Sequence, residues 1–265
     1  METTTPPTPP SPVPVPPSAT WPREPRRLAA GRGLQWWSEG WRIFMAAPLQ
    51  WLGMFVVMVL INVALHWIPI VGSLGTTIVN TIFVGGLLLG CHGLAQGRPL
   101  EFAQLFAAFR NDRLGPLAIL GLIALGVGLV IALVLGVLVM GAGAAGMLTG
   151  TMAAQDAGVG MMTAMAGMGA AALVGSLIGL VIGVLFYLAW WYAPALVAIN
   201  RAAPVDALKA SFRASTANLG AMTVFLLVFV LLALVASIPF GLGWLVLGPV
   251  AFGAGYASWR EVFGD

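Results

Sequence analysis

Long apolar runs alternate with short polar segments along most of this 265-residue chain. Six runs of 17 to 25 residues follow one another from residue 49 onward. A helix needs about 20 apolar residues to cross about 30 Å of hydrocarbon. The pattern therefore predicts an all-α polytopic membrane protein with six transmembrane helices. The expected spans are about 49–68, 73–94, 116–140, 170–192, 219–238 and 243–259.

A short segment with apolar residues at helical spacing precedes each pair of runs. We expect these three segments to be amphipathic helices on the cytoplasmic membrane surface. They are Gly33–Ala47, Pro99–Arg110 and Pro204–Arg213. Pro48 and Pro69 are 21 residues apart, as are Asn218 and Pro239, and this common spacing indicates a repeat. The expected parallel hairpin units are 33–95, 99–200 (with a Gly, Ala and Met linker at 141–168) and 204–263.

The chain divides into a tail, residues 1–32, and a membrane domain, residues 33–265. Ten of the 18 prolines lie between Pro6 and Pro25. Proline fixes φ and lacks an amide donor, so we expect a disordered cytoplasmic tail. Two P-x-x-P spacings fit polyproline ligands, but a spacer is the preferred interpretation. No cleavable signal peptide is visible.

Charge supports this topology. Only 8% of residues are charged, against about 25% in soluble domains. All twelve basic residues fall on one side of the six-span arrangement, and a five- or seven-span arrangement would break that partition. The positive-inside rule then places both termini in the cytoplasm. Eleven arginines against one lysine, together with 34 glycines, suggest a GC-rich bacterial genome.

Small residues and tryptophans suggest how the spans pack. Small residues at four-residue spacing allow close helix contact, so ridges on spans 3 and 4 predict a tight pair. A substrate path lined by glycine is the alternative. The helix-packing candidates are Gly128, Gly136, Gly175, Gly179 and Gly183. The tryptophans fall near the two ends of the spans, which is typical of an interfacial aromatic belt.

The expected spans contain no Asp, Glu, Lys or Arg, which argues against a proton-coupled carrier. No nucleophile, base or metal set converges, so we expect neither an enzyme nor a cofactor. His66 and His92 fall at opposite membrane faces. Asn62 and Asn80 are expected to hydrogen-bond across helices. One metal hypothesis stays open, in which the thioethers of Met162, Met165 and Met168 bind Cu(I).

Several segments resemble a known family. They are the first cytoplasmic helix, Trp190–Val197, Asp206–Arg213 and Tyr256–Phe263. Together they resemble an uncharacterised family of six-span bacterial inner-membrane proteins, related to the membrane region of some glycerophosphodiester phosphodiesterases. The resemblance covers roughly residues 33–263. It implies location and topology, supplies no catalytic residues, and includes no phosphodiesterase domain.

The leading hypothesis is a non-enzymatic membrane-organising or interaction protein whose amphipathic helices form a cytoplasmic collar. Arg42, Arg110, Lys209 and Arg213 are the candidates for contact with anionic lipid. We expect membrane lipids as partners and no nucleic acid, and leave open a protein partner or a second copy. The alternative is a transporter or facilitator of an apolar or lipid-like solute. A cavity lined by Asn62, Asn80 and Thr81 would favour that alternative.

Overall fold

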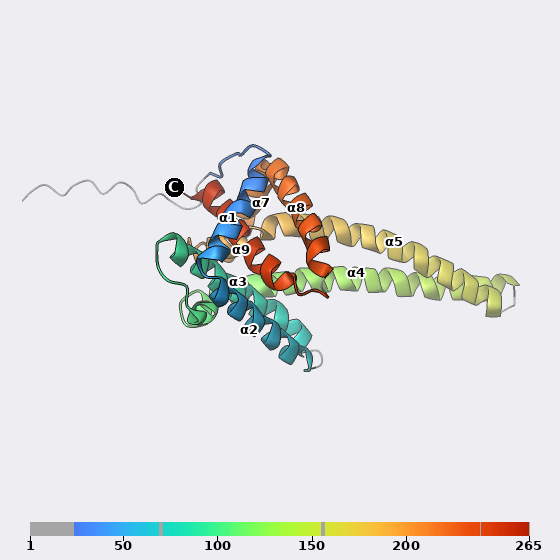
Figure 1. The fold of residues 1–265 in the computed structure, drawn as a ribbon. Helices are drawn as coiled ribbons and strands as arrows, with labels where there is room; N and C mark the ends of the chain where they lie inside the picture. Colours follow the sequence, from blue (N-terminus) through green and yellow to red (C-terminus); the bar gives the residue numbers. More distant parts are fainter. Residues whose placement is uncertain (1–23, 69–70, 155–156, 239, 265) are drawn as a thin grey trace, which may run out of the picture.

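The computed structural model describes residues 24–68, 71–154, 157–238 and 240–264. Regular structure in these ranges is helical, without β-strand, which confirms the all-α class. The elements are α1 (Arg32–Ala46), α2 (Pro48–His66), α3 (Val71–Ala95), η1 (Phe102–Phe109), α4 (Leu114–Ala154), α5 (Ala157–Trp190), α6 (Ala193–Ala198), α7 (Pro204–Ala217), α8 (Leu219–Ser237) and α9 (Trp244–Phe263). Figure 1 shows three hairpins, α2–α3, α4–α5 and α8–α9, extending in one general direction from the end that holds α1 and α7.

Five of these helices are long and apolar enough to cross a membrane, counting only the residues that the structure describes. They are α2, α3, α4, α5 and α8, with the α5 stretch extending through α6. The helix expected to be the sixth span, α9, is not among them. It carries Arg260 and Glu261 near its end and buries more than half of its side chains inside the protein. The six-span count therefore stays a prediction.

The segment 99–110 differs from the expected α-helix. Pro99 and Leu100 are not helical, and Glu101 is extended. A 3₁₀-helix follows, in which Leu105 and Ala108 are buried. Their spacing of three residues matches the 3₁₀ period. A side chain at Gly86 of α3 would meet the carbonyl oxygen of Leu105 and lie 2.7 Å from that of Gln104. Close packing against α3 thus favours the tighter turn.

The linker expected at 141–168 is wrong, because α4 continues to Ala154 and α5 begins at Ala157. Alanine and methionine are good helix formers, and the glycines here allow two backbones to approach. A side chain at Gly146 would lie 2.6 Å from the Thr163 carbonyl oxygen. The Thr163 hydroxyl donates to the Gly146 carbonyl at 2.6 Å. At 1.5 Å per residue, the 41-residue α4 is about 61 Å long, twice the hydrocarbon thickness.

The expected small-residue seam between spans 3 and 4 is correct only in part. Side chains added at Gly175 and Gly179 would meet Leu135 and Ile131 of α4, the latter at 3.1 Å. Side chains added at Gly128, Gly136 and Gly183 would meet nothing within 4 Å. Those three glycines face away from the partner helix. The closest α4–α5 approach lies further out, within residues 143–167.

A short break separates α5 from α6. Ser211 of α7 is fully buried there, accepts from the Tyr192 amide at 2.9 Å and donates to the Leu188 carbonyl at 3.1 Å. It satisfies backbone groups that the helix end leaves unpaired. Pro194 then lies in the first turn of α6, where its missing amide hydrogen costs nothing. The span expected at 170–192 therefore ends at a break between two helices.

Residues 24–31 lie against the helical body, so the expected disordered tail 1–32 is too long at this end; residues 1–23 lie outside the described residues. The Asn218 side chain accepts from the Leu28 amide at 2.8 Å and donates to the Arg26 carbonyl at 2.9 Å. The Arg26 amide donates to the Val262 carbonyl at 3.0 Å. The segment therefore joins the α7–α8 junction to the end of α9.

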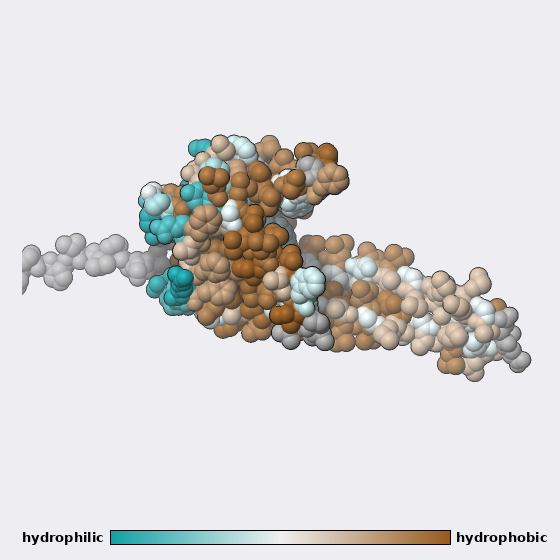
Figure 2. All heavy atoms as spheres, turned by 60° about the horizontal axis from the view of Figure 1, so that its bottom comes forward, coloured by the Kyte–Doolittle hydropathy of each residue, from teal (hydrophilic) through white to brown (hydrophobic). Residues whose placement is uncertain are grey.

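Hydrophilic and hydrophobic surface residues lie at different positions along the molecule. On the face in Figure 2, hydrophilic residues gather at the end away from the tip of the α4–α5 hairpin, and hydrophobic residues cover the middle. Charged residues of α1, α7 and the 110–113 segment belong to the hydrophilic end. This division is consistent with a helical protein whose middle lies in lipid.

Candidate functional site: an aromatic cavity between the hairpins

Two faces of helix α9 make different contacts. One of them packs on α1. A side chain at Gly40 would meet the Val250 carbonyl oxygen and lie 2.6 Å from the Ala254 amide nitrogen. One at Gly253 would lie 3.0 Å from the Gly40 Cα. Two glycines therefore let the backbones approach closely, as small residues do in membrane helix pairs.

Two tryptophans of α1 also hold this helix against α8 and α9. The Trp37 ring stacks on Phe225 of α8 at 4.7 Å, and its indole N–H donates to the Phe225 carbonyl at 3.2 Å. The Trp36 indole N–H donates to a Glu261 carboxylate oxygen at 2.7 Å. Arg32 forms an ion pair with the same carboxylate, and Arg260 lies 3.8 Å from Glu39. The predicted interfacial helix is thus also a structural part of the core.

The opposite face of α9 lines a cavity of about 580 Å³. Its contribution is one helical stripe, from Trp244 through Gly248, Ala251, Phe252 and Gly255 to Trp259. The remaining wall consists of Phe55 of α2, Val84 and Leu88 of α3, Tyr187, Trp190 and Trp191 at the end of α5, Pro194 and Ala195 of α6, and Phe225, Leu226 and Phe229 of α8. All three hairpins therefore contribute.

Aromatic rings form most of the wall and hold one another in place. Phe55 meets Phe252 edge-on at 5.5 Å, Trp191 meets Phe225 at 5.1 Å, and Phe229 meets Trp244 at 6.0 Å. Such edge-to-face pairs add about 0.5–1.5 kcal/mol each beyond burial. The wall contains no charged residue. The space suits an apolar molecule, and its volume lies within the range of ligand pockets.

Glycine keeps part of this space open. Gly255 lines the cavity and is only partly exposed, yet a side chain added there would meet nothing within 4 Å. At Gly248, by contrast, a side chain would collide with the Phe55 ring. The two glycines thus have different roles: Gly248 admits an aromatic neighbour and Gly255 leaves volume empty.

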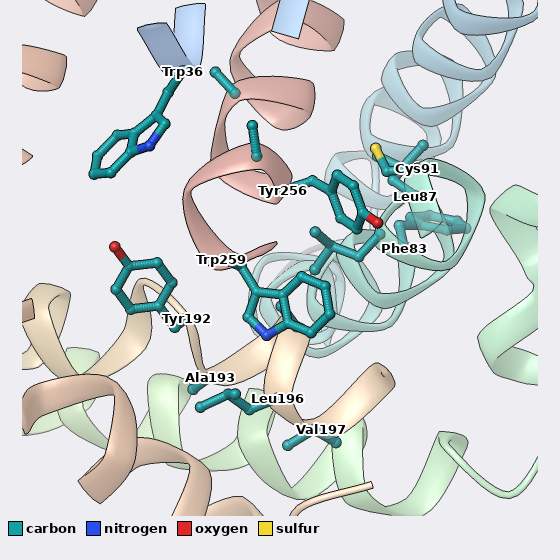
Figure 3. Packing of buried hydrophobic residues seen from close by; sticks show 14 of the residues in the cluster. Trp36, Phe83, Leu87, Cys91, Tyr192, Ala193, Leu196, Val197, Tyr256 and Trp259 are labelled. Atoms are coloured by element: carbon teal, nitrogen blue, oxygen red, sulfur yellow. The ribbon is translucent and has the colours of Figure 1, made fainter. Parts of the chain in front are cut away.

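The base of the cavity rests on the buried core. Figure 3 shows the Trp259 ring in the middle of this cluster, with Ala193 and Leu196 of α6 and Phe83 and Leu87 of α3 around it. The Trp259 ring also lies 6.1 Å from His92, which bonds to the Tyr256 hydroxyl at 3.2 Å. His92 is therefore part of the packing beneath the cavity.

The expected polar lining is not the observed one. Asn62 and Asn80 form two reciprocal amide hydrogen bonds of 2.9 Å that join α2 to α3. Thr81 is buried and bonds to the Thr77 carbonyl of its own helix at 2.8 Å. None of the three lines the cavity. The prediction that these asparagines hydrogen-bond across helices is confirmed, and the structure shows that each is the other's partner.

Exchanging both Asn62 and Asn80 for leucine should destabilise the protein by less than the sum of the two single exchanges. Each single change leaves one amide unpaired in an apolar setting, whereas the double change removes both. Hydrogen bonds between membrane helices average about 0.6 kcal/mol and reach about 1.7. A double-mutant cycle measured by unfolding in mixed micelles should give a coupling in that range. A coupling of zero would mean that the two amides do not interact.

The aromatic-belt prediction is wrong for several tryptophans. Trp36, Trp51 and Trp259 are almost fully buried in protein, and Trp190 and Trp191 line the cavity. Trp41, Trp67 and Trp244 are exposed, as a belt requires. The usable sequence signal was the spacing Trp244, Gly248, Ala251, Gly255 and Trp259, which puts one stripe on one face of a helix.

The lipid-contact candidates all lie on the hydrophilic end. Arg42, Arg110, Lys209 and Arg213 are exposed. Arg42 also pairs with Glu39 at 2.6 Å. The exposed apolar residues of α1 are Leu34, Trp41 and Met45. The structure does not bring the four cations to the cavity wall.

The three candidate copper ligands lie on the outer part of α5. Met168 packs where a side chain on Gly143 of α4 would sit, whereas Met162 and Met165 are largely exposed. In the part of the chain that the structure describes, no three His, Cys, Asp or Glu residues gather in a way that would hold a metal ion. The single cysteine, Cys91, is buried. The copper hypothesis gains no support from this placement.

The fold is all-helical, and its long apolar helices are consistent with an integral membrane protein. Comparison with known protein families, with characterised proteins and with solved structures gives no match for this chain. The resemblance to the six-span inner-membrane family therefore stays a prediction. Any functional argument must come from the cavity itself.

Proposed function

We propose that this integral membrane protein binds an apolar molecule in the cavity between its hairpins, as a carrier or facilitator of such a solute would, without catalysis. This proposal rests on the uncharged, largely aromatic wall around a cavity of about 580 Å³. Burial of apolar surface contributes about 25 cal/mol per Å², so a ligand needs no polar partner to bind there.

Native mass spectrometry of the purified protein, released from mild detergent, tests this proposal. Gly255→Phe should occupy part of the cavity, because nothing lies within 4 Å of the added Cβ. We expect apolar adducts on the parent protein and at least tenfold fewer on Gly255→Phe. Gly128→Phe, on the outer surface of α4, is the matched control and should keep them. Equal adducts on all three proteins would contradict the proposal.

A second role is supported by the exposed cations of the hydrophilic end, Arg42, Arg110, Lys209 and Arg213. We propose that they contact anionic headgroups, as basic residues beside membrane helices do. The triple exchange of Arg110, Lys209 and Arg213 for glutamine should lower retention of phosphatidylglycerol over phosphatidylcholine. Unchanged lipid preference would argue against this role.

For the topology, we propose six spans in three parallel hairpin units, with α9 as the sixth span and the hydrophilic end in the cytoplasm of a bacterial inner membrane. The same general direction of the three hairpins supports this arrangement. Cysteine introduced at Trp67 should react with an impermeant reagent added outside cells, and cysteine at Arg110 should not. Labelling of Arg110→Cys from outside would show that the orientation is opposite to the proposed one.

A further inference from the structure

The cavity opens sideways between α5 and α8. Three of its lining residues are exposed: Tyr187 of α5 at 40%, Leu226 of α8 at 46% and Trp244 at the start of α9 at 42%. Deeper lining residues are buried, such as Phe225 at 4% and Trp259 at 5%. α5 packs mainly on α4 and α7, and α8 on α1 and α9, which leaves a mouth between them.

This mouth is surrounded by apolar surface. Val184 on α5 and Val230 on α8, which lie one helical turn from the lining residues Tyr187 and Leu226, are exposed. Both helices belong to the candidate membrane spans. A molecule that enters here therefore comes from the hydrocarbon of the bilayer. Water-soluble ligands would meet lipid first.

The shape of the space narrows the class of ligand. The α9 stripe that lines it runs from Trp244 to Trp259, fifteen residues or about 22 Å along the helix. The space is therefore long and has no charged side chain in its wall, which suits an extended hydrocarbon chain.

We infer that the occupant is a single hydrocarbon chain of a membrane lipid, which enters sideways from the bilayer between α5 and α8. This inference rests on the proposed binding function and names its ligand. The uncharged wall holds the chain, and the headgroup stays outside the cavity because no charged side chain lines it. Aromatic rings at both ends of the stripe, Trp244 and Trp259, limit the length of chain that fits.

Photolabelling of the full chain in nanodiscs tests this inference. One probe is a phosphatidylcholine with a diazirine at the end of one acyl chain, and the other is a diazirine sterol. We expect the acyl probe to label the cavity stripe, at Ala251 or Gly255, at least tenfold more than the sterol. Gly255→Phe should lose this labelling, and Gly128→Phe should keep it. Labelling of Leu231, which faces outward on α8, should not differ between the variants.

The failures can be told apart. Stronger labelling of the stripe by the sterol would overturn the single-chain inference and leave the binding function intact. No labelling of the stripe by either probe would contradict both. Acyl labelling that persists in Gly255→Phe would show that the probe reports surface lipid, and would also overturn the inference. Ala251→Trp serves as a second cavity-filling variant in case Gly255→Phe fails to fold.

Discussion

Replacing Gly40 by alanine should destabilise the protein by about 1–3 kcal/mol, the usual cost of overpacking. The added methyl group would meet the Val250 carbonyl oxygen and lie 2.6 Å from the Ala254 amide nitrogen. Both are backbone atoms of α9 and cannot rotate aside, so the two helices must move apart. Thermal unfolding in detergent, followed by circular dichroism, measures the effect. Because α9 also lines the cavity, we expect weaker retention of apolar adducts as well.

Gly128→Ala is the matched control, and its effect should have the opposite sign. The added methyl group meets nothing within 4 Å, and alanine is about 1 kcal/mol better than glycine inside a helix. The same chemical change therefore stabilises one helix and disrupts the packing of another. Two equal effects would mean that α1 does not approach α9 closely.

Asn218→Ala should release the N-terminal segment from the helical body. The side chain loses its bonds to the Leu28 amide and the Arg26 carbonyl, and buried polar groups left unpaired cost about 1–3 kcal/mol. A loss of about 2 kcal/mol raises the open population about 30-fold. Cleavage of the opened segment follows that population when reclosing is fast. Limited trypsin digestion at Arg26 and Arg27 should therefore accelerate by about that factor.

Thr216→Ala provides the comparison for this measurement. Thr216 is exposed in the last turn of α7, and its hydroxyl donates to carbonyls one turn back, such as that of Phe212 at 2.8 Å. Its removal should leave the cleavage rate within about twofold, as expected for a surface change of about 0.5 kcal/mol or less. Equal rates for Asn218→Ala and the parent protein would show that the segment is not held by this amide.

Packing in this protein uses two kinds of glycine contact. At Gly40 and Gly253 the two backbones themselves approach, whereas at Gly248 a glycine makes room for an aromatic ring. Both devices act on α9, and both bring aromatic side chains to the cavity wall. This explains why α9 buries more of its surface than α8 and is also less apolar. A helix covered by other helices does not need a uniformly apolar surface.

Much of the fold followed from local sequence patterns. Runs of apolar residues placed α2, α3 and α8 to within about three residues, since prolines and polar residues mark their ends. The amphipathic spacing in 33–47 and 204–213 placed α1 and α7. The segment 141–168 was misjudged because glycine reads as a helix breaker in isolation. Its glycines are instead the contact surface of two helices, and only the pairing of α4 with α5 reveals this.

The cavity could not be predicted from the sequence alone, for a related reason. The chain by itself determined a membrane-type composition, helices at given positions, and a charged end separated from apolar helices. These depend on neighbouring residues and on the solvent around each segment. Tertiary structure alone decided that Tyr187, Phe229 and Gly255 share one wall, because they come from three different helices. In lipid, nearly any apolar side chain is tolerated on a helix surface, so composition does not distinguish a residue that faces lipid from one that lines an internal space.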